Sequence, residues 1–429
     1  MFATSLFGVL GFSLITGAMV GGILAAIGLL ILTFFFDGNY SVIANSVWGI
    51  TTNYSLTAIP MFIFMGEILG ATGVATRIYD AFAPLFQRLP GGLVQSNIGT
   101  CATFSAISGS STATTAVVGS IAFDELMQRG YDRNLVAGSI AGGGTLGMLI
   151  PPSIILIFYG SLTDVPVGKL FIAGVIPGLL VALLFMLYIA FVAKTSPSKT
   201  PQNTGVMPLG KALIHSLAGW PFVLLVVAIL GSMFAGIATA TEAAGLGVIT
   251  AIILATVYGE MTPSRFFSAV RSTAIVFSGL GVLLLGGVTL AQSVSLSGLP
   301  DLVLTAMQDA NLSPIIAIAM VYLLYLILGC VFGAIEMLLI TLPFTFPLMT
   351  ALGFDPLWLG VALVILIELG LLTPPLGLNL FMVMGMSKGE LSLGEAARAA
   401  LPYWLILLSF LVLITKFQDI VLFLPNVLS

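Results

Sequence analysis

Long runs of apolar residues, separated by short polar segments, make up most of the chain. Runs such as residues 217–236, and the run that starts at residue 402, are long enough to cross a hydrocarbon core of roughly 30 Å as helices. The ten-residue segments of alternating polarity that build a membrane barrel are absent. Because backbone groups in a bilayer must pair internally, the pattern predicts an all-α integral membrane protein.

Uninterrupted apolar runs predict continuous membrane spans. The first run is long enough either to cross with a tilt or to contain a bend at Gly21 and Gly22. The predicted spans cover residues 5–36, 56–70, 170–193, 213–234, 242–258, 272–296 and 402–424.

Polar and amphipathic segments are expected between these spans. Residues 74–89 are amphipathic, so we expect them to lie along the membrane surface. Residues 194–211 form the one long hydrophilic linker, which separates two halves of the chain. The remaining segments are a polar connection at residues 37–55, a loop with Arg265 and Arg271, and an amphipathic piece at residues 388–400.

Four further apolar runs are interrupted near their centres. Residues 93–127 and 314–349 break at the glycine-containing segments 108–111 and 329–333. Helices beside the first break would have about 15 residues, short of the roughly 20 that a crossing needs. These runs therefore predict two re-entrant helical hairpins. The other two runs, residues 134–163 and 357–384, predict broken helices at Pro151-Pro152 and Pro374-Pro375.

The second set of breaks repeats the first at a fixed distance. The landmarks GYD, PP and F begin at residues 130, 151 and 158, and GFD, PP and F follow at residues 353, 374 and 381, a constant offset of 223 residues. Glycine- and proline-interrupted apolar segments at matching places in two halves point to the binding site of a secondary transporter. The repeat therefore predicts that the breaks form one site.

Composition agrees with a membrane protein and excludes other classes. The 429 residues are 59% hydrophobic and 7% charged, with a mean hydropathy of +1.17, whereas roughly a quarter of the residues in soluble proteins are charged. Residues 1–6 carry no positive charge before the first apolar run, so no cleaved signal peptide is expected. Cys101 and Cys330 lie in apolar runs, which is typical of buried thiols rather than a disulfide. One histidine and two distant cysteines provide no metal-binding cluster.

The basic residues predict an orientation. If the linker is cytoplasmic and each hairpin returns to its own side, only Lys169 and Lys416 of the 13 Lys and Arg residues fall outside, as the positive-inside rule requires. The first hairpin then enters from the cytoplasm and the second from outside, so the repeats are inverted. The inner residues are Arg77, Arg88, Arg129, Arg133, Lys194, Lys199, Lys211, Arg265, Arg271, Lys388 and Arg398.

A helix that breaks inside a bilayer leaves N–H and C=O groups without partners, at a cost of several kcal/mol each. Such breaks are therefore candidate binding sites. At the first break the incoming helix ends in free carbonyls, which suit a small hard cation together with Ser105 and Ser108. The outgoing helix begins at Ser110, Ser111 and Thr112, where hydroxyls, N–H groups and the positive helix end suit an anion.

The proline pairs add further acceptors. Pro151-Pro152 lacks two N–H donors and frees carbonyls around Gly147 and Met148, close to Thr145. Glycine and serine also mediate close helix packing, and prolines often only kink a membrane helix. Packing alone does not predict the same hairpin and broken helix twice, so we interpret the breaks as functional. The second half supplies a matching set in Gly329, Gly333, Thr373 and Asn379.

Four acidic residues in the apolar runs are expected to be buried and are also candidates, because charge is costly inside a membrane. Glu336 and Glu368 lie beside the second hairpin tip and the second break, so contact with a cation and a hydrogen-bonded structural role are equally open. Glu67 and Glu242 favour a structural role. His215 lies beside the linker, where a solvated or interfacial position is expected rather than a proton relay.

The tip GSSTATTAVVG, the run RGYD ahead of GMLIPPSIILIFYG, and GFDP ahead of LLTPPLGLNLF resemble the large membrane subunit of tripartite ATP-independent periplasmic (TRAP) transporters. The resemblance covers nearly the whole chain. It implies a secondary transporter of the bacterial inner membrane, driven by a sodium gradient and without another cofactor. The implied partners are a periplasmic substrate-binding protein, a small four-helix membrane subunit and the lipid bilayer, but no nucleic acid. The hairpin-bearing part is implied to move as an elevator against a fixed scaffold.

The resemblance also implies roles for individual residues. One sodium ion would involve Ser105, Ser108, Gly109 and Thr145, and a second Gly329, Gly333, Thr373 and Pro374. Substrate would lie between the hairpin tips, near Ser110, Ser111, Thr112, Pro152 and Asn379.

The implied domains alternate along the chain between scaffold and transport elements. Scaffold elements would be residues 1–90, residues 169–312 with the linker, and residues 401–429, and transport repeats would be residues 91–168 and 313–400. The small subunit is not expected to be fused, because the chain begins directly at the first large-subunit span.

Two positions differ from the usual family pattern. Many members carry Asp where this chain has Thr114-Thr115 and Glu336. At Thr114-Thr115 the chain resembles the branch of the family that includes sialic acid carriers.

Together these features predict sodium-coupled import of a small organic acid, such as sialic acid or a C4-dicarboxylate. The breaks offer oxygens more than titratable groups, which favours sodium over protons. A stand-alone ion-coupled carboxylate symporter without a binding protein is the alternative. An ion channel is less expected, because channels need rotational symmetry around a pore. An enzyme with Ser110 or Ser111 as nucleophile lacks a His or Lys partner, so no enzymatic activity is expected.

Overall fold

The computed structural model describes residues 20–36, 40–201, 207–258, 261–298, 302–305, 309 and 313–428. Every regular element in these residues is a helix, which confirms the all-α prediction. Eight helices in the described part, some made of adjoining pieces, are long and apolar enough to cross a membrane. The part of the first predicted span that precedes Val20 lies outside the described residues.

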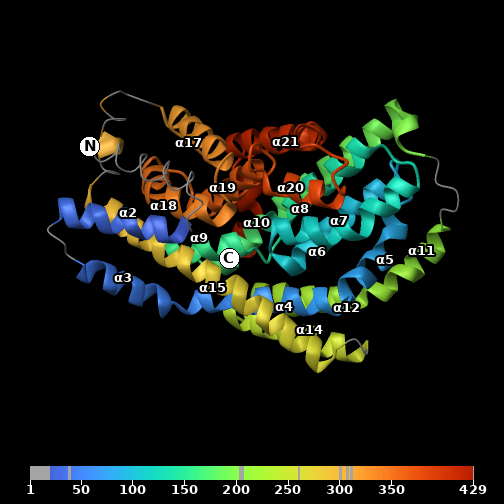
Figure 1. Ribbon diagram of the computed structural model, residues 1–429, viewed down its shortest axis with the longest axis horizontal. Helices are drawn as coiled ribbons and strands as arrows, with labels where there is room; N and C mark the ends of the chain where they lie inside the picture. The colour runs from blue at the N-terminus through green and yellow to red at the C-terminus, as the bar shows by residue number, and fades with distance from the viewer. Residues whose placement is uncertain are drawn as a thin grey trace.

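A group of long helices lies along the lower side of Figure 1. Helix α15 (Pro263–Leu296) packs against α2 (Val20–Phe35) and α4 (Ala58–Ala71), and α4 packs against α14 (Ala240–Val257). A Cβ atom on Gly286 would lie 1.9 Å from the carbonyl oxygen of Gly21. Gly286 therefore serves the close approach of α2 and α15, as does Gly21, whose added Cβ would lie 2.6 Å from the Val282 carbonyl oxygen.

The four interrupted runs form four pairs of helices, as predicted. The pairs are α6 (Leu93–Ser108) with α7 (Ser111–Gln128), α8 (Arg133–Leu149) with α9 (Ile154–Thr163), α17 (Pro314–Gly329) with α18 (Ala334–Ala351), and α19 (Pro356–Leu371) with α20 (Leu378–Met386). Both Pro-Pro bonds are cis. Figure 1 shows α6 and α7 in the right half of the view and α17 and α18 in the left half.

The aspartates of the two repeated landmarks begin matching helices. The side chain of Asp132 accepts a hydrogen bond from the Leu135 N–H at 2.9 Å, at the start of α8. The side chain of Asp355 accepts one from the Leu357 N–H at 2.7 Å, at the start of α19. The sequence repeat is therefore a repeat of helix-capping structure.

Two predicted connections are instead helical. Residues 37–55, predicted as a polar connection, include α3 (Ser41–Thr51), and a 3₁₀ turn follows at Tyr54–Thr57. The predicted loop with Arg265 and Arg271 belongs to α15. The Thr262 hydroxyl accepts a hydrogen bond from the Arg265 N–H at 3.2 Å and Pro263 begins the helix, so the span starts earlier than its apolar run.

The end of the chain also differs from the prediction. The amphipathic piece and the last span were expected to meet near residue 401, but α21 (Leu393–Lys416) is continuous through Pro402. A reciprocal cap between Ser392 and Glu395 starts this helix. The chain then turns near Phe417 and continues as α22 (Asp419–Leu428).

The remaining predicted elements are found with small shifts. Helix α5 (Val74–Phe86) corresponds to the amphipathic segment and α10 (Val167–Thr195) to the span before the linker. The linker contains a short helical turn, Pro197–Lys199, and its residues 202–206 lie outside the described part. The next span is composite, with α11 (Leu209–Ser216), a 3₁₀ turn (Leu217–Gly219), α12 (Trp220–Val226), a π-helical turn (Val227–Gly231) and α13 (Ser232–Phe234).

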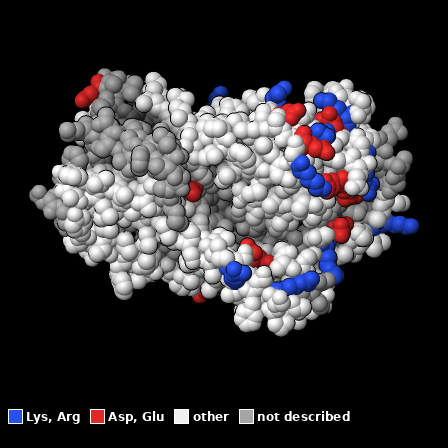
Figure 2. All heavy atoms as spheres, viewed as in Figure 1, with Lys and Arg blue, Asp and Glu red and all other residues white. Residues whose placement is uncertain are grey.

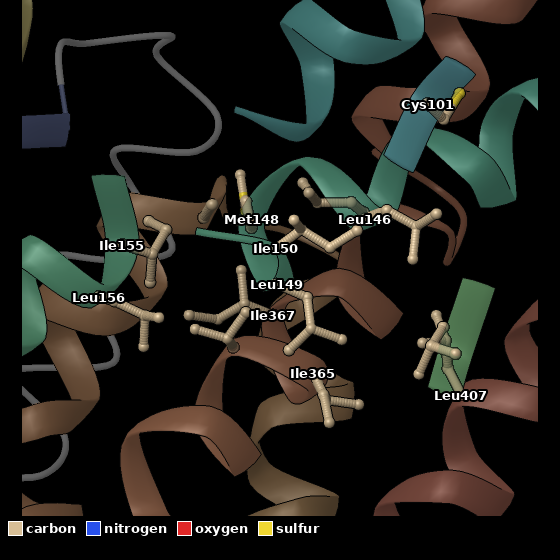
Figure 3. Close-up of a cluster of buried hydrophobic side chains, with 14 of the residues drawn as sticks. Cys101, Leu146, Met148, Leu149, Ile150, Ile155, Leu156, Ile365, Ile367 and Leu407 are labelled. Atoms are coloured by element: carbon tan, nitrogen blue, oxygen red, sulfur yellow. The ribbon is translucent and has the colours of Figure 1, made fainter. Parts of the chain in front are cut away.

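Helix α19 forms the centre of the apolar core. Every residue from Trp358 to Leu371 is buried. Figure 3 shows Leu149, at the end of α8, beside Ile367 of α19, so the core joins the two halves next to the first proline pair. This packing positions the two sets of breaks relative to each other.

Charged side chains gather at the right end of the view in Figure 2. Ion pairs there join segments that are far apart in the sequence, with Lys388 Nζ 2.8 Å from Asp124 Oδ2 and Arg133 Nη2 2.7 Å from Glu390 Oε2. The linker docks on the same end, because the Asp132 N–H donates to the Lys199 carbonyl at 3.0 Å. We call this region the charged end.

Candidate functional site

The first hairpin tip lies directly on the first proline pair. Gly109 has a φ of 61° and its carbonyl accepts a hydrogen bond from the Ile154 N–H at 3.2 Å. A Cβ atom at Gly109 would lie 2.8 Å from the Pro152 carbonyl oxygen. The left-handed conformation and the close approach both require glycine. We call this contact the first junction.

Hydroxyl groups fill the first junction. Ser108 Oγ lies 2.7 Å from Thr114 Oγ1, and the Thr114 hydroxyl also donates to the Ser110 carbonyl at 2.8 Å. Ser110 caps α7 by accepting a hydrogen bond from the Ala113 N–H at 3.4 Å. A Cβ atom at Gly147 of α8 would lie 2.5 Å from the Ser110 carbonyl oxygen. The end of α8 therefore packs against the tip as well.

Two predicted cation ligands are buried nearby but bond within their own helices. The Ser105 hydroxyl donates to the Cys101 carbonyl, and the Thr145 hydroxyl donates to the Gly142 carbonyl at 2.6 Å. Both hydroxyl oxygens keep capacity to accept from a donor or to contact a cation.

A second junction has the same plan. The Leu376 N–H, just after the second proline pair, donates to the Cys330 carbonyl at 3.2 Å, which places that pair on the second tip. Gly329 packs against Gly370, and a Cβ atom at Gly329 would lie 2.5 Å from the Gly370 Cα. Thr373 accepts a hydrogen bond from Trp404 Nε1 at 3.1 Å. Pro374, another predicted cation contact, is exposed.

One side chain joins the two halves in the interior. Asn379 of α20 is fully buried, and its Nδ2 donates to Ser111 Oγ at 2.8 Å and to the Ala141 carbonyl at 3.2 Å. Its Oδ1 is buried and has no hydrogen-bond partner among the described residues. The structure thus brings together two of the residues predicted to bind substrate. Thr112, one residue after Ser111, is partly exposed.

The acidic candidates have different environments. Glu368 is fully buried, and both carboxyl oxygens have no hydrogen-bond partner in the described part of the chain. Glu336 is in the first turn of α18, and a Cβ atom at Gly333 would lie 2.5 Å from its Oε2, so the carboxyl folds back over the helix start. Glu242 is exposed, which corrects its prediction as a buried acid, and it caps α14 with Thr239. Glu67 is half-buried.

Sequence reasoning did not assign several residues that build the junctions. Thr114 lies in the GSSTATT run, but its bond to Ser108 depends on the turn at Gly109. Trp404 is 31 residues from Thr373, and no local sequence pattern predicts the hydrogen bond between them. The role of the Cys330 carbonyl could not be predicted, because every residue has a backbone carbonyl and the sequence does not show which ones accept long-range hydrogen bonds.

The described residues contain no group of three or more His, Cys, Asp or Glu that could hold a metal ion. The oxygens at both junctions are instead hydroxyls and carbonyls. Such oxygens suit a hard cation that accepts neutral ligands, in contrast to zinc or copper, which prefer nitrogen and sulfur.

Two cavities separate the junction helices from the α3 and α15 group. A cavity of about 400 Å³ is lined by Asn53, Ser161, Gln292 and Phe346, among others. A second, of about 370 Å³, is lined by Asn53, Phe158 and Leu284, among others. Asn53 Nδ2 contacts the Ser161 carbonyl at 3.4 Å between them. The boundary between α15 and the pair α9 and α18 thus contains cavities beside a close contact at Gly287, where an added Cβ would lie 2.8 Å from Leu339 Cβ.

The chain matches the family described as "Tripartite ATP-independent periplasmic transporter, DctM component" over residues 7–420. It is 35% identical over 400 residues to the C4-dicarboxylate TRAP transporter large permease protein DctM of Pseudomonas aeruginosa, across 93% of this chain and 92% of that protein. It is 29% identical over 425 residues to the sialic acid TRAP transporter large permease protein SiaM of Vibrio cholerae, across 98% of each. The solved YdaH transporter of Alcanivorax borkumensis shares the fold, with a TM-score of 0.65, 16% identity, and coverage of 90% of this chain and 91% of that chain.

Proposed function

Because the chain belongs to the DctM family of TRAP transporters, a family of membrane transporter subunits rather than enzymes, we propose that it carries small organic acids into the cell by sodium symport. The relatives from Pseudomonas aeruginosa and Vibrio cholerae transport a C4-dicarboxylate and sialic acid, and both substrates carry carboxylates. We assign the same chemical class to this chain. A periplasmic binding protein and a small membrane subunit complete the tripartite system.

The contact between Asn379 and Ser111 is the observation that carries this proposal. It joins the second broken helix to the start of α7, where the first N–H groups of a helix have no partner within the helix. The partly exposed Thr112 and the positive helix end lie next to this contact. A carboxylate at this position would accept hydrogen bonds from the Thr112 hydroxyl and from the first N–H groups of α7. The Asn379 amide, which donates to Ser111 and Ala141, would hold the start of that helix in place.

Sodium coupling is supported by the chemistry of the two junctions. Each junction concentrates backbone carbonyls and hydroxyls where helices end, and carbonyls at helix ends favour cations. In the first junction Ser105, Ser108, Gly109 and Thr145 would surround one ion, and in the second Gly329, Gly333, Thr373 and Pro374 would surround the other.

An elevator motion is supported by the two cavities at the boundary with α15. A transport unit must slide against a scaffold, and close packing along the whole boundary would oppose that. The two cavities beside Asn53 interrupt the packing there. We assign α6 to α9 and α17 to α20 to the moving part, with their hairpins re-entrant from opposite faces of the inner membrane and the charged end in the cytoplasm.

Uptake into proteoliposomes tests the proposal. The chain is reconstituted with its small subunit, and radiolabelled C4-dicarboxylate or sialic acid is supplied with and without binding protein and an inward sodium gradient. We expect uptake that requires both. The variant Ser111→Ala should lower uptake severalfold, because it removes the buried acceptor of the Asn379 amide at the start of α7, and such a hydrogen bond is worth about 0.5–1.5 kcal/mol.

Ser120→Ala is the matched control, because Ser120 lies on the same helix and its hydroxyl donates to the Val117 carbonyl away from the tip. Uptake that needs sodium but no binding protein would support a stand-alone symporter. Uptake indifferent to sodium would contradict coupling, and equal loss in Ser111→Ala and Ser120→Ala would contradict the assigned site.

A further inference from the structure

A third cavity, of about 220 Å³, lies at the charged end, apart from both junctions. It is enclosed by the starts of α8 and α21, the last turns of α10, and the linker. Helix α8 separates it from the first proline pair by about 25 Å, given 17 residues at 1.5 Å each. The polar residues that line it are Asp132, Asn134, Tyr188, Lys199, Arg398 and Tyr403.

Tyr403 forms the floor of this cavity. It is 1% exposed, and its ring packs edge-on against the rings of Phe185 and Tyr188, with centroids 5.0 and 5.3 Å away. Its Cβ faces Gly142 and its Cε2 faces Gly138, so the hydroxyl points toward the start of α8. Tyr403 Oη is buried and has no hydrogen-bond partner among the described residues. A buried hydroxyl without a partner is uncommon in native structures, and it leaves a donor free for a water molecule or another bound group.

The rim of the cavity is electropositive. Lys199 and Arg398 are both exposed, and neither forms an ion pair with any described residue. The Asp132 carboxylate caps the start of α8 and offsets the partial positive charge of that helix N-terminus. The one carboxylate, Asp132, uses its Oδ1 to accept the Leu135 N–H. Two cations, of which Arg398 also donates from Nε to the Gly394 carbonyl at 3.2 Å, and one unpaired hydroxyl donor therefore outweigh one carboxylate that is engaged at the helix start.

We propose that this cavity binds a phosphate group, either of a soluble phosphate or of an anionic phospholipid headgroup. The phosphate oxygens accept from Tyr403 Oη at the floor and face Lys199 and Arg398 at the rim. The bound group links the linker to α21. It thereby strengthens the docking of the linker on α8, where the Asp132 N–H already donates to the Lys199 carbonyl.

Thermal unfolding of the purified full chain in detergent, followed by tryptophan fluorescence, tests this site. Potassium phosphate is compared with potassium chloride at equal ionic strength, and dihexanoyl phosphatidic acid with dihexanoyl phosphatidylcholine. We expect inorganic phosphate or phosphatidic acid, but not the zwitterionic phosphatidylcholine, to raise the unfolding midpoint with a saturable dependence, because the anionic phosphate binds the folded state. Tyr403→Phe, which keeps the packed ring, should weaken the affinity about tenfold.

Arg398→Gln and Lys199→Gln change exposed side chains, so they should fold normally and weaken binding at least as much. Arg129→Gln is the matched control, because Arg129 is also at an exposed helix end but pairs with Glu125 and does not line the cavity. A response to inorganic phosphate supports a soluble ligand, and a response to phosphatidic acid alone supports a lipid headgroup. No response, or equal responses in the wild type, Tyr403→Phe and Arg398→Gln, would overturn the proposal.

Discussion

At the first junction, Pro151, Pro152 and Ser153 are buried beneath the tip, whereas at the second junction Pro374, Pro375 and Leu376 are exposed. Both junctions use one backbone hydrogen bond from the residues after the proline pair to the tip. The first adds a hydroxyl network around Ser108, while the second relies on the contact of Gly329 with Gly370 and on the indole of Trp404. The same backbone plan therefore supports one enclosed and one open junction.

We expect the largest effect from filling the enclosed junction. Gly109→Ala places a Cβ 2.8 Å from the Pro152 carbonyl oxygen and also forces a φ of 61° on alanine. The combined strain and overpacking should destabilise the protein by about 2–5 kcal/mol. The unfolding midpoint in detergent and sodium-driven uptake should both fall.

Gly353→Ala separates the two contributions, because Gly353 has a φ of 87° but nothing within 4 Å of its added Cβ. Gly353→Ala should lower the free energy of unfolding by only about 1–2 kcal/mol. At the open junction, Gly329→Ala meets the Gly370 Cα at 2.5 Å without a positive φ, so about 1–3 kcal/mol is expected. Equal losses at Gly109 and Gly353 would show that the first tip is not closely packed.

Breaking the interior link between the two halves should have the next largest effect. Asn379→Ala removes the donor to Ser111 and to the Ala141 carbonyl, and should destabilise by about 1–3 kcal/mol. A double-mutant cycle with Ser111→Ala should give a coupling of about 1 kcal/mol in thermal or chemical unfolding. Strictly additive effects would contradict a direct bond between the two residues.

The two junctions should both affect the sodium dependence of uptake. Ser108→Ala and Thr373→Val each remove one hydroxyl, and each should raise the sodium concentration for half-maximal uptake about tenfold if that oxygen contacts the ion. Thr373→Val should also lower stability, because Trp404 Nε1 loses its acceptor. Thr350→Val is the control, since that hydroxyl bonds to the Phe346 carbonyl within α18. An unchanged sodium dependence in both variants would remove these hydroxyls from the ion sites.

The exposed link between the halves should matter least. Lys388 Nζ lies 2.8 Å from Asp124 Oδ2, and this hydrogen bond, aided by the charge of Asp124, raises the pKa of Lys388. The pair therefore contributes below the unfolded pKa of lysine and is lost only as the pH rises through the folded pKa, well above neutrality. Because both partners are exposed, Lys388→Gln should leave the unfolding midpoint at pH 7 nearly unchanged. A loss as large as that of Asn379→Ala would contradict the contrast between buried and exposed links.

Some features of the fold followed from local sequence alone. The Gly-Ser and Pro-Pro interruptions ended helices where predicted, because glycine tolerates a left-handed turn and proline removes a donor regardless of tertiary context. The helix boundaries that were predicted wrongly were those that hydropathy alone could not determine. Helix α15 begins at Pro263 because Thr262 caps it, and α21 passes through Pro402 where the apolar pattern suggested a boundary.

The sequence by itself determined the membrane class, the breaks, their repeat at an offset of 223 residues and the resemblance to one family, because these depend on composition and spacing. Only the tertiary structure decided that Asn379 reaches Ser111 across 268 residues, that Glu368 has no partner among the described residues, and that Tyr403 lines one cavity with Lys199 and Arg398. Such contacts depend on how closely the helices approach at their glycines. The periodicity of one helix carries no information about its distance from another.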